Sequence, residues 1–444
     1  NPMYNATLHT QDFTGYLNLA NNTQVQCDLS SAIRLSGRFS FYNQKDHYER
    51  FRPADATQLI NYTGADYFKR GSYSISDGDE FNYQGDFTFN YGKSFGSNTL
   101  YITAGTQFQE NRYTSNGVTA EGFPNQDLDN IGYAFSIKEN SLVGDETIRR
   151  NIGFLANASY SYNNRFLLDA SFRTDGSSQF GSKKLFAPFY SIGAGWNLHK
   201  ERFMQELTYI SRLKLRASFG STGSQSFPSY MSLQSYHYLT GDQYRNATGA
   251  LLIGLGNPNL QWQQSYKTNV GADVELARSR ILFTANVYRE RTDALITSVS
   301  TPPSMGFLSY KANLGEVENK GIELYLTAFL IKKDRERINW SVNAAFFQNR
   351  NRILKISDAL KQQNEEQIEK SSGLTTPVML LEEGQSQTAI YAVPSLGIDP
   401  SNGYELYVKR DGSLTYKWDP RDQVAIGDRE AKFYGTFGTN IMFK

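Results

Sequence analysis

The sequence predicts an all-β protein whose antiparallel strands run up and down as part of a transmembrane β-barrel. Two observations carry this prediction. Apolar and polar residues alternate with period two over stretches longer than an ordinary strand, so each stretch has one apolar and one polar face. The connections between the stretches alternate between short and long along the whole chain, which is typical of outer-membrane barrels.

The clearest alternation lies in residues 150–180, which read as one long hairpin. From Ile152 onward every second residue is apolar or aromatic, and the return strand resumes the pattern at Phe166. Asn163 and Asn164 predict a tight turn, because asparagine adopts positive φ at low cost. Aromatic residues beside this turn are typical of a lipid–water boundary. By itself, the hairpin fits a soluble sheet equally well, with the apolar face turned to a core.

The same alternation recurs from end to end of the chain. It predicts thirteen strands, at 14–28, 31–44, 80–95, 98–112, 147–163, 164–176, 187–199, 211–222, 263–278, 280–297, 318–332, 337–352 and 431–444. Six residues on the apolar faces are expected to face lipid, namely Ile152, Phe154, Leu168, Phe283, Leu324 and Val342. A charged residue at such a position near the membrane midplane should cost about 2–4 kcal/mol.

The connections distinguish a membrane barrel from a soluble sandwich. The short ones are predicted at 29–30, 96–97, 163–164, 200–210, 278–279 and 333–336. The long ones are predicted at 45–79, 113–146, 177–186, 223–262, 298–317 and 353–430. A sandwich has no reason to place all long connections at one end, so the alternation favours short periplasmic turns and long extracellular loops.

Helix is expected to be scarce. Residues 201–207 could form a short helix within the one longer periplasmic turn. Residues 361–370 could form a polar helix in the last loop, but a solvated loop segment is the interpretation that we prefer there.

Composition narrows the class of protein further. The chain has 444 residues, a net charge of +1 and 20% charged residues, fewer than the roughly 25% of soluble proteins. The absence of a basic surplus argues against nucleic-acid binding. No run of 18 apolar residues predicts a transmembrane helix. No signal peptide is readable at the start, so either the chain is not exported or its true N-terminus is missing.

The sequence offers no catalytic pattern and predicts no cofactor. The single cysteine, Cys27, excludes an internal disulfide framework and a multi-cysteine metal site, and a structural thiol is expected. Asp77, Asp79 and Glu80 could ligate calcium, although a solvated acidic cluster is the expected interpretation. The histidines are scattered and show no metal-binding spacing, at His9, His47, His199 and His237. Nothing in the sequence supports an enzyme.

One long loop has an unusual composition. Residues 227–245 contain four tyrosines that are candidates for substrate binding, Tyr230, Tyr236, Tyr238 and Tyr244. Tyrosine combines a flat apolar ring with a polar tip, which suits stacking on sugar rings or gripping peptides. The alternative is that these rings pack the loop onto its neighbours.

Eight stretches, dispersed in order along the chain, carry a family resemblance. They are NPMYNA (1–6), FRTDGSSQFG (172–181), FYSIGAGWNLHKERFMQE (189–206), LKLRASFGSTGSQ (213–225), GNPNLQWQQS (256–265), GEVENKGIELYL (315–326), GIDPSNG (397–403) and IGDREAKFYGTFGTNIMFK (426–444). Through them the chain resembles the barrel of SusC-like TonB-dependent transporters, the outer-membrane nutrient importers of the Bacteroidetes type. In the last stretch Arg429 stands where proline is usual in the family.

The resemblance implies a location and a function. The expected location is the outer membrane of a Gram-negative bacterium, with the apolar faces against outer-membrane lipid. The expected function is import of oligosaccharides or oligopeptides, driven by TonB through a plug and a TonB box outside this chain. A SusD-like surface lipoprotein is the expected partner, while nucleic acid is not. Much of the docking surface for this lipoprotein, or of the substrate-facing wall, is expected to come from loops 223–262, 298–317 and 353–430.

The resemblance also implies an architecture. Residues 1–444 are expected to form a central segment of a 22-stranded barrel, without the plug and the N-terminal domains. The alternative function is a structural or adhesive surface barrel, whose loops bind a partner and which moves nothing.

Overall fold

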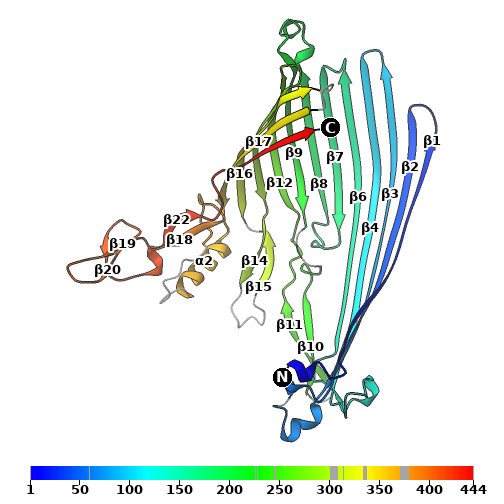
Figure 1. Cartoon of the computed structure of the whole chain (residues 1–444), viewed down its shortest axis with the longest axis vertical. Coiled ribbons are helices and arrows are strands. Elements are labelled where there is room, and N and C mark those ends of the chain that lie inside the picture. Colours follow the sequence, from blue (N-terminus) through cyan, green and yellow to red (C-terminus); the bar gives the residue numbers. More distant parts are fainter. Residues whose placement is uncertain are drawn as a thin grey trace. The chain divides into compact units, whose positions relative to one another are not determined.

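The large sheet of this computed structural model follows the predicted pattern of strands. The structure describes residues 2–59, 61–225, 227, 229–244, 247–300, 309–313, 315–333, 338–370 and 380–443. The strands of the large sheet, in spatial order, are β1 (Gln11–Asp28), β2 (Ile33–Arg52), β3 (Ser72–Phe95), β4 (Asn98–Glu121), β6 (Val143–Tyr162), β7 (Phe166–Ser177), β8 (Phe186–Asn197), β9 (Ile210–Ser224), β12 (Gln263–Leu276), β13 (Ile281–Asp293), β16 (Glu316–Lys333), β17 (Ile338–Lys355) and β23 (Tyr434–Phe443) (Figure 1). The short strand β5 (Ser136–Ile137) pairs with β4.

Each of the thirteen predicted strands has its counterpart in this sheet, and the all-β, up-and-down fold class is confirmed. The largest differences lie at the ends that lead into long connections. There β2 continues to Arg52, β3 begins at Ser72 and β4 continues to Glu121. These extensions consist largely of polar residues, so hydrophobic alternation does not reveal them. The predicted turn at 333–336 lies mostly outside the described residues.

The chain divides into two compact units. Unit 1 comprises Asn1–Asn90, Gly105–Phe154 and Gly176–Ser178, and unit 2 comprises Tyr91–Ala104, Leu155–Asp175 and Gln179–Lys444. In unit 1, β1 and β2 pair in unbroken register from Gln11 opposite Phe51 to Asp28 opposite Arg34. A small apolar cluster lies where the strands of this unit end, formed by Phe51, Tyr73, Ala120 and Phe123.

The tight turns show why particular residues stand in them. Asn163 and Asn164 both have φ of 51°, as the sequence predicts. The turn between β12 and β13 is more strained, because three non-glycine residues in succession have positive φ, namely Ala277, Arg278 and Ser279. Hydrogen bonds hold this turn in place. The Ala277 amide donates to Tyr209 O at 2.9 Å, and the Ser279 amide donates to Ser211 Oγ at 3.1 Å.

Strand pairing in unit 2 aligns apolar residues into rows on one face of the sheet. One row runs from Ala272 through Ala285 and Leu324 to Phe346, across β12, β13, β16 and β17. Two residues along each strand, the next row contains Phe283 and Leu326. We call this the apolar face of unit 2, and the opposite side the polar face. Of the residues expected to face lipid, Phe283, Leu324 and Val342 lie on this face, half-buried between their row neighbours.

The other three residues expected to face lipid lie on β6 and β7. Ile152, Phe154 and Leu168 are 39%, 48% and 45% exposed. None of them belongs to the clusters of buried apolar residues found within the described parts of the chain. They therefore do not pack as they would in the core of a soluble sandwich.

The long connections contain structure of their own. They form the hairpin β10 (Ser235–Tyr244) with β11 (Ala247–Gly254), the hairpin β14 (Ile296–Ser300) with β15 (Ser309–Asn313), the pair β18 (Ala389–Ala392) with β22 (Val424–Asp428), and a sheet of β19 (Ser395–Ile398), β20 (Glu405–Val408) and β21 (Leu414–Thr415). One turn of α-helix, α1 (Pro2–Asn5), begins the described chain, and the short 3₁₀ turns are Thr57–Leu59, Gly64–Lys69, Ile131–Tyr133, Leu198–Lys200, Arg202–Met204 and Pro420–Asp422.

The two helix predictions fare differently. Residues 201–207 form only a single 3₁₀ turn, Arg202–Met204. The preference for a loop at residues 361–370 is wrong, because they lie in α2 (Asp358–Lys370). Tertiary contacts stabilise this polar helix. Leu360 is buried in a cluster with Val317 and Ile353, and the Asn364 side chain donates to Leu381 O at 2.6 Å and accepts from the Leu381 amide at 3.0 Å. Among the described residues no helix is long and apolar enough to cross a membrane.

A buried aromatic cluster joins two of the stretches that carry the family resemblance, 172–181 and 256–265. Phe180 stacks on Trp262 with ring centroids 4.5 Å apart, and both belong to one buried cluster with Leu260. Gly181 is required beside it, because a Cβ there would lie 2.1 Å from Pro258 O. These stretches thus anchor the connection between β9 and β12 to the strands.

A charge introduced on the apolar face tests its orientation. In the complete protein, Leu324→Arg should make folding into lipid vesicles less favourable by about 2–4 kcal/mol, because the apolar face of a barrel meets hydrocarbon. Urea titration of refolding measures this loss. The neighbouring Glu323→Arg, on the polar face, is the control and should cost much less. Equal losses for the two variants would contradict the assigned orientation.

Candidate functional site

The polar face of unit 2 is built around Arg216 on β9. Its guanidinium donates two hydrogen bonds to Asp273 on β12, from Nε to Oδ2 at 3.1 Å and from Nη2 to Oδ1 at 3.2 Å. Nη2 also donates to Asn286 Oδ1 on β13 at 2.8 Å. Thr284 Oγ1 donates to Asp273 Oδ1 at 3.2 Å. Gly271 leaves room for this network, because a Cβ there would lie 2.6 Å from Asn286 Oδ1. The result is a hydrogen-bonded polar surface across three strands.

A second polar group on the same face consists of side-chain amides. Asn351 Nδ2 donates to Asn319 Oδ1 at 2.9 Å, and Asn349 Nδ2 donates to the same oxygen at 3.3 Å. Tyr288 Oη donates to Asn349 Oδ1 at 3.2 Å. Gln387, from the last long connection, joins the group by donating its backbone amide to Asn351 Oδ1 at 2.8 Å. Amide and hydroxyl groups of this kind can hydrogen-bond sugars and peptides alike.

The structure brings two of the four candidate tyrosines together. Tyr236 and Tyr238 are two residues apart on β10, so they lie on one face of the β10–β11 hairpin, opposite Leu252 and Ala250. Their exposed fractions are 54% and 65%, which leaves most of each ring available for contact.

The other two candidate tyrosines are placed differently. Tyr230 lies in a turn before the β10–β11 hairpin, with φ of 67°, and is 39% exposed. The side chain of Tyr244 lies outside the described residues. The structure therefore defines an exposed aromatic pair, Tyr236 and Tyr238, rather than a cluster of four.

The loop that carries this aromatic pair is fastened to its neighbour. Asn313 is the fastening residue, since its Nδ2 donates to Gln261 O and to Ala294 O, both at 2.8 Å, and its Oδ1 accepts from the Gln261 amide at 3.0 Å. Asn257 Nδ2 adds a bond to Lys311 O at 3.1 Å. The connections at 223–262 and 298–317 are thereby held together at their bases, although residues 301–308 and 314 are outside the described chain.

The last long connection presents an exposed apolar surface that the sequence analysis missed. We call it the 395–416 patch. Its exposed residues are Leu396 (66%), Ile398 (70%), Tyr404 (67%), Leu414 (54%) and Tyr416 (50%). An exposed apolar surface on a projecting element often marks an interaction site. In the sequence, only the similarity of GIDPSNG (397–403) to the family pointed to this region.

Asp399 organises the 395–416 patch. Its carboxylate accepts hydrogen bonds from the Ser401 hydroxyl at 2.7 Å, the Tyr416 hydroxyl at 2.7 Å and the Ser401 amide at 2.8 Å. These bonds stabilise the ionised form and hold the pKa of Asp399 below its usual value. At the base of the same connection, Tyr391 is fully buried. Desolvation, with a smaller effect of Glu382, raises the pKa of the Tyr391 hydroxyl to about 12.

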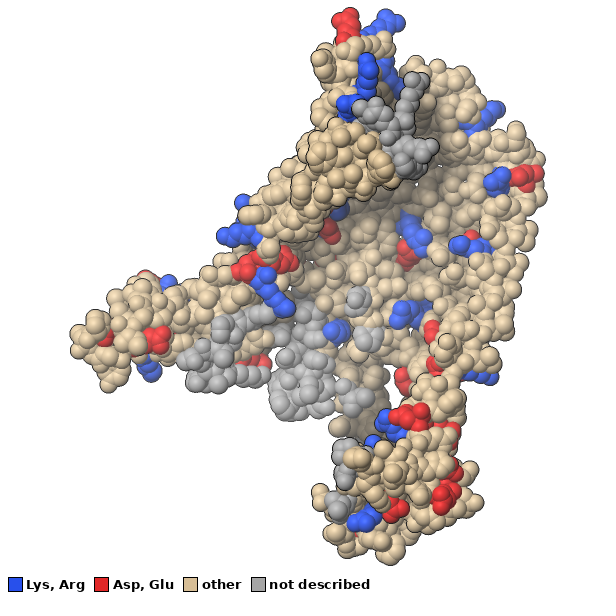
Figure 2. Space-filling model, in the orientation of Figure 1, with Lys and Arg blue, Asp and Glu red and all other residues tan. Residues whose placement is uncertain are grey.

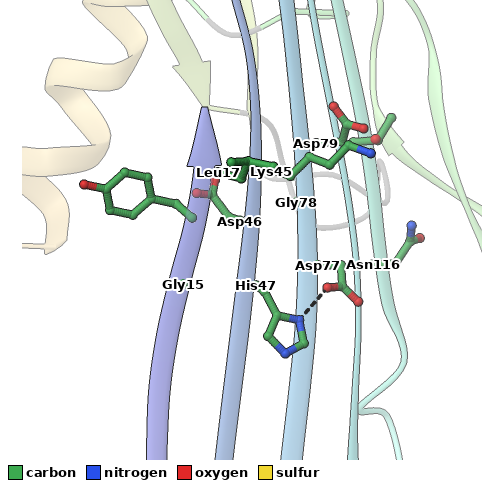
Figure 3. A pocket seen from close by; sticks show the side chains of 11 residues that line it. Gly15, Leu17, Lys45, Asp46, His47, Asp77, Gly78, Asp79 and Asn116 are labelled. Carbon is green, nitrogen blue, oxygen red and sulfur yellow. Dashed lines mark hydrogen bonds and ion pairs between the residues drawn. The ribbon is translucent and has the colours of Figure 1, made fainter. Parts of the chain in front are cut away.

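A hollow of about 580 Å³ in unit 1 is lined by two of the three acidic residues considered for calcium, Asp77 and Asp79 (Figure 3). His47 Nδ1 lies 2.8 Å from Asp77 Oδ1, and Asp79 Oδ1 accepts from Asn43 Nδ2 at 2.8 Å. Glu80 instead points to the opposite face of β3, where it accepts from Asn111 at 3.1 Å. Asp77, Asp79 and Glu80 therefore do not converge, and no group of three potential metal ligands occurs within the described ranges.

Charge on the surface is dispersed. Figure 2 shows basic and acidic side chains interspersed over the visible face of the molecule. Cys27 is a free, exposed thiol on β1.

Long antiparallel strands with one apolar and one hydrogen-bonded polar face, joined by alternately short and long connections, define an outer-membrane β-barrel protein. The family model described as TonB dependent receptor-like, beta-barrel, matches residues 2–375, and the chain belongs to this family. The recognition made from the sequence is confirmed, and with it the placement in the outer membrane.

The chain is also similar to individual proteins. It is 28% identical over 409 residues to TonB-dependent receptor P39 of Formosa agariphila, covering 91% of this chain and 37% of that protein. It is 28% identical over 217 residues to TonB-dependent receptor SusC of Bacteroides thetaiotaomicron, covering 46% and 21%. The fold matches the RagAB peptide importer in its closed-closed state with a TM-score of 0.82 at 21% identity, covering 98% and 47%. The chain thus spans less than half the length of these relatives.

The Arg216 network offers a test of how the polar face is stabilised. Arg216→Met should lower the free energy of unfolding by about 1–3 kcal/mol, because Asp273 and Asn286 lose their charged donor. Denaturant titration in detergent measures the loss. The control is Arg212→Met, because Arg212 makes only a 3.4 Å ion pair with Glu275 and should cost less than about 1 kcal/mol. Equal losses for Arg216→Met and Arg212→Met would show that the Arg216 network stabilises the protein no more than an exposed ion pair does.

Proposed function

We propose that this chain forms part of the barrel of a TonB-dependent importer that moves oligosaccharides or oligopeptides across the outer membrane. In this proposal TonB supplies energy through a plug that lies outside these residues. A SusD-like surface lipoprotein covers the extracellular opening and docks on the long loops. RagAB, whose fold this chain shares, is a peptide importer, and this similarity favours peptides among the two substrate classes.

One observation carries the proposal: the polar face of unit 2 is lined with hydrogen-bonding groups from several strands. Arg216, Asp273 and Asn286 on one part, and Asn319, Asn349 and Asn351 on another, offer donors and acceptors. Asn286, which is 7% exposed, holds the Arg216 guanidinium in place on this face. A wall that passes polar oligomers needs such a surface, because each solvent hydrogen bond lost on entry must be replaced.

The long loops supply the proposed surfaces for partner and substrate. A stable protein interface buries about 1,200–2,000 Å², which the short turns cannot furnish. The 395–416 patch is the proposed contribution of connection 353–430 to lipoprotein docking, because each of its five apolar residues is at least 50% exposed. Tyr236 and Tyr238 are the proposed substrate contacts of connection 223–262, and Tyr230 and Tyr244 remain candidates beside them.

Alanine substitutions at the tyrosines test the proposed substrate contacts. Tyr230, Tyr236, Tyr238 and Tyr244 are each changed to alanine in the complete transporter, and ligand uptake and co-purification of the lipoprotein are measured. Tyr236→Ala and Tyr238→Ala should each reduce apparent substrate affinity by roughly fivefold or more, as for aromatic residues at binding hot spots. The matched control is His237→Ala, since His237 lies between them on the other face of β10.

Two outcomes would contradict this assignment. If all four variants import normally and still hold the lipoprotein, the tyrosines only pack the loop. If His237→Ala loses as much uptake as Tyr236→Ala, the loss reflects the hairpin fold and not ring contacts. No uptake at all from the intact protein would instead favour the adhesive barrel, and uptake that persists without TonB would contradict the energised mechanism.

A further inference from the structure

A row of basic side chains crosses three strands on the apolar face of unit 2. Arg289 on β13 pairs with Lys320 on β16, which pairs with Arg350 on β17. The preceding row, two residues nearer the short turns, contains Val287 opposite Ile322. Because residues two apart share a face, the cations stand on the same surface as the apolar rows. They lie one step toward the end that carries the long connections.

The heads of these cations are accessible around a shallow hollow. The hollow has a volume of about 690 Å³ and is lined by residues of both rows. The Arg289 and Lys320 side chains are 60% and 57% exposed, and Val287 and Ile322 beneath them are 56% and 37% exposed. Adjacent strands are about 4.8 Å apart, so the three cations follow one another at that spacing. The surface therefore offers apolar contact and positive charge side by side.

The row has more positive charge than its neighbours neutralise. A single carboxylate, Glu318, accepts from Arg289 Nε at 2.5 Å and pairs with Lys320 Nζ at 2.7 Å. Glu318 is only 5% exposed, so it positions these two cations and leaves their outer sides free. Arg350 has no ion-pair partner among the residues that the structure describes. Three cations against one carboxylate leave a surplus of two positive charges.

Several other cations on the strands have at least one carboxylate each. In the next row of unit 2, Arg291 contacts both Asp293 and Glu316 at 2.8 Å. In unit 1, Arg150 contacts Glu110 at 2.6 Å and Arg112 contacts Glu146 at 2.8 Å. Arg289, Lys320 and Arg350 differ from these pairs because three cations in adjacent strands share one carboxylate. A surplus of this kind on a lipid-facing surface calls for an anion.

We propose that Arg289, Lys320 and Arg350 bind the phosphate groups of a phosphorylated lipid in the outer leaflet. The apolar rows below, beginning with Val287 and Ile322, contact its acyl chains. Arginine matches phosphate because its planar fork donates two parallel hydrogen bonds. The long connections mark the extracellular side, so the head-group level next to them is that of the outer leaflet. A free phosphate ion would satisfy the cations but not the exposed apolar rows.

The test uses the complete, folded transporter in detergent. The triple variant Arg289→Gln, Lys320→Gln, Arg350→Gln removes the row. The matched control, Arg212→Gln, Lys214→Gln, Lys267→Gln, removes equal charge from the polar face of the nearby strands β9 and β12. Retention of lipid A is measured by native mass spectrometry, beside lipid A with its phosphates removed and beside competition with inorganic phosphate. Heat-modifiable migration on SDS gels verifies that each variant is folded.

The native protein and the polar-face control should retain lipid A and release its dephosphorylated form. The row variant should bind lipid A roughly 100-fold more weakly, because each basic side chain near a charged membrane surface contributes about fivefold. Equal retention of lipid A by the native protein and the row variant would overturn the proposal. So would equal retention of the phosphorylated and dephosphorylated lipids. Complete displacement of lipid A by inorganic phosphate at equal concentration would show an ion site and would also overturn it.

Discussion

The structure depends on one constraint: each strand must hydrogen-bond to its neighbours while it presents apolar side chains on one face only. Hydrocarbon cannot satisfy a free backbone group, so the ladders must be continuous. Continuous pairing then fixes which residues of adjacent strands stand opposite one another. Val270, Val287 and Ile322 form such a row across β12, β13 and β16. A slip of one residue in β13 would replace Val287 by Asn286 or Tyr288 on the apolar face.

The same fixed registers also determine the polar surface. Once Val287 and Phe283 face one way, Asn286 and Thr284 must face the other. The partner strands bring Arg216 level with Asn286 and Asp273 level with Thr284, and hydrogen bonds connect the four groups. The same logic places Arg289, Lys320 and Arg350 side by side, although about 30 residues separate each from the next in the sequence. Apolar wall, polar network and basic row are thus three results of one pairing scheme.

The sequence predicts the features that follow from period-two alternation within one strand. It predicts little of what depends on how neighbouring strands align. The strands follow from alternation, and the turn at Asn163 and Asn164 follows from residue type. Alternation does not predict the continuation of β2 beyond residue 44, because polar residues there occupy both faces and pairing with the neighbouring strands β1 and β3 extends the strand. Helix α2 was missed because contacts of Leu360 and Asn364 stabilise it, and its own composition does not. The basic row was invisible, since no pattern within one strand reveals which residues of three strands align.

The long connections solve a different physical problem from the wall. They cannot use lipid to hide apolar surface, so each needs its own core at the point where strands end. Phe180, Phe189 and Trp262 form one such core, and Val317, Ile353 and Leu360 form another. These clusters combine residues of the large sheet with residues of the connections, and Asn313 ties two connections to each other. Exposed side chains of the connections, such as Tyr236, Tyr238 and Leu396, are consequently not needed for this packing. That separation lets the outer loop surface vary in sequence while the strand ends keep the loops in place.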